Sequence, residues 1–213
     1  MEKDLRLTIS RKQTLVIFFI MALVMGISMD GSFIIGYLTM LASIVAVGTI
    51  SYDEFDNGFA FLMTLPFERK TYVREKYLFS LILAAMAWFV GLILYCVGNI
   101  IRHSAVSPLD ELPMLLSLLP ALYLSAAIMI PLLLKYGSER SRVVLYIIFG
   151  IIAIVLFGAK SFFSGSSNIF AELTKILDSM NPTFVLFILT AICVLVAYIS
   201  YLSSIQIMEK KEF

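Results

Sequence analysis

Apolar and polar positions divide the chain into six long apolar runs separated by shorter polar segments. The runs cover about residues 14–29, 33–50, 77–101, 114–134, 143–159 and 184–207. A helix that crosses a bilayer needs about 20 apolar residues, so each run predicts a membrane-spanning helix, and the first and fifth are the shortest. The pattern therefore predicts an all-α membrane protein with a single transmembrane domain over residues 1–213.

The positive charges predict how these helices are oriented. Loops on the cytoplasmic side of a membrane carry an excess of Lys and Arg. With both termini in the cytoplasm, 13 of the 16 Lys and Arg residues fall on the inner side, and only Arg102, Lys160 and Lys175 fall on the outer side. The sequence therefore predicts six spans with cytoplasmic N- and C-termini.

Two segments outside the spans have the pattern of amphipathic helices. Residues 1–13 place Leu5 and Ile9 on one face among several basic residues, which predicts a helix at the cytoplasmic interface. Between 160 and 182, apolar residues recur at helical spacing before the sixth span. We expect a re-entrant or interfacial helix on the outer side. Such a helix either lines an exit path or rests passively on lipid, and the pattern fits both equally well.

The segment Ser51–Lys76 is the one long polar interruption between apolar runs, and it holds nine of the 31 formal charges. Ser51 and Glu54 have the spacing of a capping box at a helix start. Phe55, Phe59 and Leu62 then recur at i, i+4 and i+7, which predicts a short amphipathic helix. Its aromatic content is high for a mere loop, and it favours a helix that docks on a soluble partner.

Composition excludes several classes of function. A net charge of +1 gives no electrostatic basis for binding nucleic acid. There is no G-x-x-x-x-G-K-[ST] loop, so the chain does not hydrolyse ATP by itself. The one histidine, His103, and the two cysteines in apolar runs offer no metal site, and the interiors of the spans contain no ionisable residue of the kind that ion-coupled transporters use.

Three segments together resemble a known family. The N-terminal KDLRLTISRK (Lys3–Lys12) is similar to an amphipathic basic helix before a first span. The segment SYDEFDNGFAFLMTLPFERKTYVREKYL (Ser51–Leu78) looks like an acidic turn, a coupling helix and an LP-x-x-RK-x-x-x-x-x-KY connector to a third span. With the long outer segment before the sixth span, the chain resembles the small six-span permease subunits of ABC-2 transporters, in which the ATPase is a separate polypeptide.

This resemblance implies a permease subunit of an ABC exporter in the bacterial cytoplasmic membrane. Two copies of an ABC ATP-binding subunit would supply ATP hydrolysis, with ATP and Mg bound there, so the chain itself would need no cofactor and no catalytic residue. A second permease chain, identical or homologous, would complete the path. The apolar spans favour an amphipathic or hydrophobic cargo, and a peptide fits best.

The resemblance also implies where the ATPase would couple. Aromatic side chains of the coupling helix would fill a cleft of the ATPase, acidic residues would pair with its basic groups, and a connector from Pro66 to Lys76 would move the third span. The implied interface consists of Tyr52, Asp53, Glu54, Phe55, Asp56, Phe59, Phe61, Leu62, Leu65, Pro66, Arg69 and Lys70.

Two alternatives belong to other classes of function. The chain would be a non-transporting membrane scaffold or sensor if residues 51–76 merely docked a cytosolic protein. A membrane-embedded hydrolase would need a catalytic acid inside a span, whereas Asp53 and Glu54 are expected at a cytoplasmic end and have no histidine partner.

Overall fold

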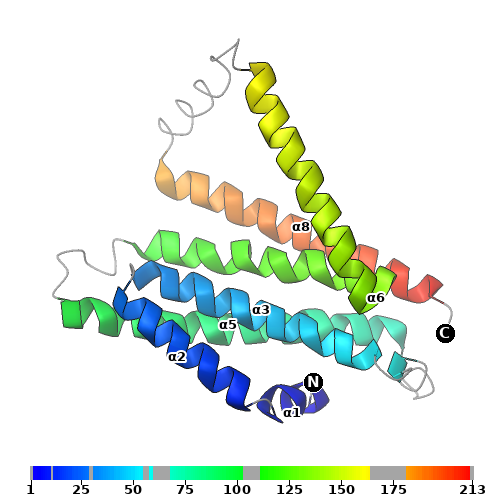
Figure 1. Ribbon diagram of the computed structural model, residues 1–213, viewed down its shortest axis with the longest axis horizontal. Helices are drawn as coiled ribbons and strands as arrows, with labels where there is room; N and C mark the ends of the chain where they lie inside the picture. Colours follow the sequence, from blue (N-terminus) through cyan, green and yellow to red (C-terminus); the bar gives the residue numbers. More distant parts are fainter. Residues whose placement is uncertain are drawn as a thin grey trace.

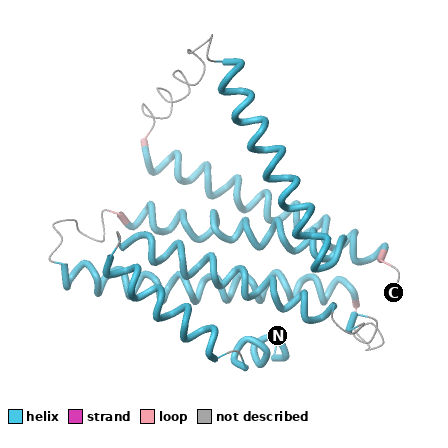
Figure 2. Tube along the Cα trace, viewed as in Figure 1, coloured by secondary structure: helices cyan, strands magenta, loops and turns pink. Residues whose placement is uncertain are grey.

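The computed structural model describes residues 2–10, 12–28, 31–54, 58–59, 68–102, 111–163 and 181–211, and these residues are helical with few exceptions. The helices are α1 (Glu2–Ser10), α2 (Lys12–Ser28), α3 (Gly31–Glu54), α5 (Arg69–Arg102), α6 (Leu112–Phe163) and α8 (Pro182–Lys210) (Figure 1). The described residues contain no strand, as Figure 2 shows. The all-α prediction is therefore confirmed for this part of the chain.

Four long segments form the body of the molecule. In Figure 1, α3, α5, the first half of α6 and α8 run roughly along the same axis, and α3 contacts both α5 and α6 while α8 packs against α6 and α5. Between α5 and α8, the Tyr77 hydroxyl lies 2.7 Å from Ser200 Oγ and 2.9 Å from Ser204 Oγ. The shorter helix α2 contacts α3 and α5 at the side of the bundle.

The main apolar core lies towards one end of this bundle and draws on α3, α5, α6 and α8. Its buried members include Ile50, Val73, Ile130, Leu134 and Met208. Glu54, Arg69, Gly137 and Lys210 also lie at this end, as the contacts of Glu54 with Ser138, Arg69 with Glu209 and Lys211 with Leu134 show. Contacts at this end therefore decide how the helices are held relative to one another.

Four helical segments are long and apolar enough to cross a membrane, judged by length and composition within the described residues: Phe33–Glu54, Arg69–Ile101, Leu112–Ile148 and Thr183–Lys210. They include the predicted spans at 33–50, 77–101, 114–134 and 184–207. The predicted first span falls in α2, which has 17 residues. The predicted fifth span falls in the second half of α6, so the arrangement of six spans and its orientation stay predictions.

Two helices extend beyond the predicted spans. The turn Ser51–Glu54 is the last turn of α3 and not the start of a new helix, so the capping-box prediction is wrong. Helix α5 begins at Arg69, eight residues before the predicted span at 77, because the charged side chains of its first turns find partners on other helices. Residues 55–57 and 60–67, with most of the predicted coupling helix, and residues 164–180, with most of the predicted outer helix, lie outside the described residues.

Helix α6 is bent at a single residue. Gly137 has φ 80° and ψ 176° within an otherwise continuous element. The sequence predicts two spans separated by a charged segment at 135–142, but the interruption is confined to Gly137. The second half, Ser138–Phe163, leaves the bundle at a steep angle and is drawn in yellow-green in Figure 1. Its side chains Tyr146 and Ile154 are 72% and 73% exposed.

Candidate functional site

The predicted coupling segment starts and finishes at the end of the bundle where α1, α3, α5, α6 and α8 meet. Its described parts are the last turn of α3, Gly58 and Phe59, and the chain from Glu68 onward. Charged side chains from distant parts of the sequence gather on both sides of this segment. These contacts form the candidate site.

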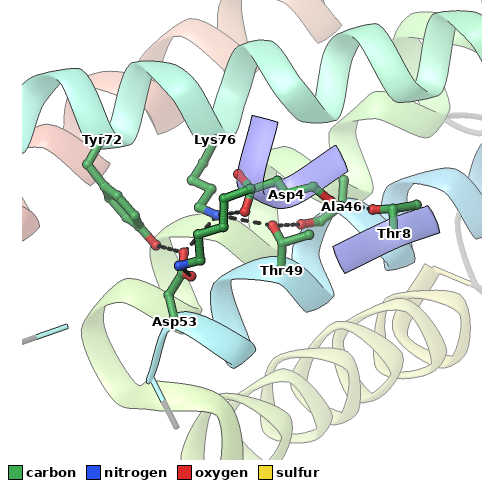
Figure 3. A network of polar contacts seen from close by, with 8 residues as sticks. Asp4, Thr8, Ala46, Thr49, Asp53, Tyr72 and Lys76 are labelled. Carbon is green, nitrogen blue, oxygen red and sulfur yellow. Dashed lines mark hydrogen bonds and ion pairs between the residues drawn. The ribbon is translucent and has the colours of Figure 1, made fainter. Parts of the chain in front are cut away.

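A buried ion network lies on one side of the site (Figure 3). The Lys76 ammonium on α5 is 2.7 Å from Asp4 Oδ1 on α1 and 2.7 Å from Asp53 Oδ2 on α3. It also donates to Thr49 Oγ1 at 3.2 Å. The side chains of Asp4 and Lys76 are each 3% exposed, and that of Asp53 is 1% exposed. One lysine thus joins three helices away from water.

Two further groups complete the bonding of Asp53. The Tyr72 hydroxyl donates to Asp53 Oδ2 at 2.9 Å, and Lys3 of α1 forms an ion pair with the other carboxylate oxygen. Two carboxylates and two ammonium groups leave the network with no net formal charge. Charges out of water are tolerated only when they are paired and hydrogen-bonded, so this network fastens α1 to α3 and α5 in one arrangement.

Glu54 points to a different helix from its neighbour Asp53. Its Oε2 accepts a hydrogen bond from the Ser138 backbone N–H at 2.5 Å, directly after the bend in α6. On the other side of the bend, Lys211 Nζ donates to the Leu134 carbonyl oxygen at 3.0 Å. Partial burial lowers the pKa of the Lys211 ammonium, and the negative charge of Glu54 opposes that shift.

Phe59 and Arg69 bind the rest of the segment to the bundle. The Phe59 side chain is 5% exposed. It packs edge-on against Tyr72 with ring centroids 5.8 Å apart, and Lys211 Nζ lies 4.8 Å from the centre of its ring. Arg69 Nη1 donates to the carbonyl oxygens of Met208, Glu209 and Lys211 at 3.3, 2.9 and 2.9 Å. Arg69 thus caps the C-terminus of α8.

The structure therefore gives several predicted interface residues partners within the chain. Asp53, Glu54, Phe59 and Arg69 contact α1, α5, α6 or α8, as described above. Lys70 forms an exposed ion pair with Glu209 at 3.2 Å, and Tyr52 is half-buried in the last turn of α3. The other predicted interface residues lie outside the described part of the chain: Phe55, Asp56, Phe61, Leu62, Leu65 and Pro66.

Sequence reasoning missed several residues of this site, which are Lys3, Asp4, Thr49, Lys76 as a buried group, Gly137 and Lys211. A charged residue directly before an apolar run, as Lys76 is, was the one available signal. No group of three or more His, Cys, Asp or Glu side chains that could hold a metal ion occurs among the residues that the structure describes.

Comparison with known proteins identifies the family. A sequence model described as "ABC-2 family transporter protein" matches residues 1–209. The chain belongs to this family. No curated protein and no solved structure matches it.

Membership of the ABC-2 family gives the general class of protein to which this site belongs. The chain is a multi-pass membrane protein and a membrane component of an ABC transporter. Such components typically lack catalytic activity of their own and work with an ATPase partner. The charged end of this ABC-2 protein carries four residues that the sequence assigns to the ATPase interface, Asp53, Glu54, Phe59 and Arg69, and that interface stays a prediction.

Proposed function

We propose that this chain is the permease subunit of an ABC exporter with six spans and cytoplasmic termini. With a second permease chain, identical or homologous, it forms the path for an amphipathic or hydrophobic cargo, for which a peptide fits best. Two ATP-binding subunits drive the cycle. The match to the ABC-2 family over nearly the whole chain supports this proposal, as do the apolar, exposed faces of α5, α6 and α8.

The observation that carries the coupling proposal is the way both ends of residues 55–67 are held. At the first end, Asp53 and Glu54 bind α1, α5 and α6 through ionic and charged hydrogen bonds. At the second end, Arg69 binds the C-terminus of α8. A force applied to the segment between them is therefore delivered to every long helix of the bundle at once.

The roles within the interface then divide into two groups. We assign Asp53, Glu54, Phe59 and Arg69 to the frame that holds the segment, because they bind α1, α6 or the C-terminus of α8 or pack in the core. The ion pair of Lys70 with Glu209 is solvent-exposed and is not counted in the frame. The contact with the ATPase itself is assigned to the remaining predicted residues: Tyr52, Phe55, Asp56, Phe61, Leu62, Leu65, Pro66 and Lys70. In this proposal the apolar members seat in a cleft of the ATPase, and Asp56 pairs with its basic groups.

Co-expression of the full chain with an ABC ATPase encoded beside it tests the proposal. We expect the two to co-purify and the ATPase rate to depend on the permease. Replacing a central aromatic anchor of an interface costs at least about 2 kcal/mol, so Phe61→Asp should weaken the association about 30-fold while the melting temperature of the chain stays unchanged.

Phe59→Ala is the variant to compare with Phe61→Asp, because it changes a residue that holds the segment to the bundle and not one assigned to the ATPase contact. Because Phe59 is buried against Tyr72, this change should lower the melting temperature of the isolated chain, unlike Phe61→Asp. Association that leaves the ATPase rate unaltered would instead support the scaffold alternative. If the wild-type chain binds no ABC ATPase at all, the permease proposal is rejected.

A further inference from the structure

The bend in α6 separates two backbone groups that would bond to each other in a continuous helix. In an α-helix the Ser138 N–H donates to the carbonyl of Leu134, four residues earlier. Here the N–H donates to Glu54 Oε2 and the carbonyl accepts from Lys211 Nζ. A carboxylate from the end of α3 and an ammonium group from the end of α8 thus replace the two halves of one helical hydrogen bond.

The signs of the two charges match the ends that they bind. Leu134 lies at the C-terminal end of the first half of α6, where the helix dipole is negative, and Lys211 is positive. Ser138 lies at the N-terminal end of the second half, where the dipole is positive, and Glu54 is negative. Each pairing is stabilising at a helix terminus, and a hydrogen bond to a charged group is stronger than one between neutral groups.

Gly137 makes this arrangement sterically possible. Its φ of 80° with ψ of 176° is a backbone conformation that is essentially restricted to glycine. A Cβ atom at this position would overlap with Oε1 of Glu54. The absence of a side chain therefore permits both the bend and the close approach of the carboxylate that caps the following helix.

We propose that Glu54 and Lys211 are positioning residues that hold α6 bent at Gly137 and so set the direction of Ser138–Phe163. This inference rests on the proposed function in one respect: Glu54 directly precedes the segment assigned to the ATPase, so displacement of that segment withdraws the carboxylate from Ser138. Without this bond the bend at Gly137 is no longer held at one angle, and the second half of α6 swings relative to the bundle while it remains in the membrane. The ATPase thereby controls the second half of α6 as well as α5.

The bend is tested first on the full-length chain alone, in lipid nanodiscs. Spin labels at Ile154 on α6 and Phe187 on α8, both exposed, report the angle between these helices by double electron–electron resonance, in a background without Cys96 and Cys193. Losing one charged hydrogen bond shifts a two-state equilibrium by about tenfold or more. We expect Glu54→Ala and Lys211→Met each to populate a second distance at the expense of the wild-type one.

The double variant and the conservative variants sharpen this test. Glu54→Ala with Lys211→Met should shift the distribution little further than either change alone, because both act on the same pair of backbone groups. Glu54→Gln keeps an acceptor oxygen and should retain most of the wild-type distance. Lys70→Met, which removes an exposed ion pair at the same end of the bundle, should leave the distribution unchanged.

Gly137→Ala supplies an independent variant, with Gly150→Ala in the same helix as its control. Nothing lies within 4 Å of a Cβ atom built on Gly150, so that change should be tolerated. Gly137→Ala expels the Glu54 carboxylate and should produce the same second distance as Glu54→Ala. If Gly137→Ala and Glu54→Ala both retain the wild-type distance distribution, the proposal is overturned.

Co-purification with the ATPase separates this inference from the proposed function. Glu54→Ala and Lys211→Met should still bind the ATPase. Each variant should stimulate the ATPase rate about tenfold less than the wild-type permease does. A wild-type chain that binds no ATPase would reject the proposed function and leave the result on the bend standing. Variants that shift the bend yet keep full coupling would reject the link between the bend and the ATPase.

Discussion

Lys76 holds a positive charge where only 3% of its side chain is exposed. Its two carboxylate partners, Asp4 and Asp53, are just as deeply buried. A buried ion pair adds little stability compared with a well-packed apolar pair, but removal of one partner leaves the other charge without compensation. The network around Lys76 therefore adds little net stability. Its main effect is to hold α1 in one position on α3 and α5.

Replacing Lys76 by methionine tests this role at the level of one residue. The change leaves Asp4 and Asp53 buried with one partner fewer, and it should cost about 3–5 kcal/mol. The unfolding temperature of the full chain in detergent, followed by the fluorescence of its one tryptophan, Trp88, measures the loss. Lys70→Met removes an exposed pair and should change stability by about 0.5 kcal/mol or less. Equal melting temperatures for the two variants would show that the network does not hold the fold.

Arg69 acts at the level of a helix. The last carbonyl groups of any α-helix lack partners within the helix. One guanidinium nitrogen of Arg69 lies within hydrogen-bond distance of two of them in α8, those of Met208 and Glu209, and of the Lys211 carbonyl directly after the helix. A planar guanidinium with several donors suits this task better than an ammonium group does. The first turn of α5 thus fastens the last turn of α8.

We expect Arg69→Ala to loosen the end of α8 and leave its beginning unchanged. Hydrogen–deuterium exchange of the full chain should become faster at residues 205–211, because their carbonyl and amide groups fray without the cap. Exchange at residues 183–195 and in α1 should match the wild type. Lys70→Ala, one residue along the same turn, is the control. Unchanged exchange at 205–211 in Arg69→Ala would contradict the capping role.

The long helices were predictable from sequence because a membrane-spanning helix requires a long apolar run, which is visible in the sequence. Runs of apolar residues of the right length predict helices regardless of what they contact, which is why α3, α5 and α8 appear where expected. Their ends were not predictable in this way. The continuation of α3 to Glu54 depends on contacts with residues far away along the chain, such as Asp53 with Lys3, 50 positions apart, and Glu54 with Ser138, 84 positions apart.

The role of the candidate site as an ATPase interface stays a prediction. The charges and aromatic residues at 51–76 led to that prediction, and the described part of this segment lies where the helices meet. Sequence alone gives no directions for side chains, so Asp53 and Glu54 were both assigned to an outside partner, whereas they bind helices within the chain. Gly137 carried no signal either, since the charged residues around it indicate a loop and a one-residue bend equally well.

At the scale of the whole molecule, the direction of α8 bears on the number of spans. Lys211, directly after α8, contacts Leu134 at the end of the first half of α6. A 29-residue helix is about 44 Å long, so Pro182 lies at the opposite end of the bundle. The chain must therefore return along the bundle between Ser138 and Pro182, and among the described residues of this stretch the second half of α6 is the one helix.

Cysteine accessibility in intact cells tests this return crossing. Single cysteines replace the exposed residues Glu139 and Asn181 in a chain without Cys96 and Cys193. The six-span arrangement predicts that a membrane-impermeant maleimide labels position 181 from outside and position 139 only after the membrane is opened. The reason is that Lys135, Arg140 and Arg142 around the bend favour the cytoplasm, whereas Asn181 precedes the last span on the other side. If both positions react from the same side, Ser138–Phe163 does not cross the membrane, and the four apolar segments alone span it.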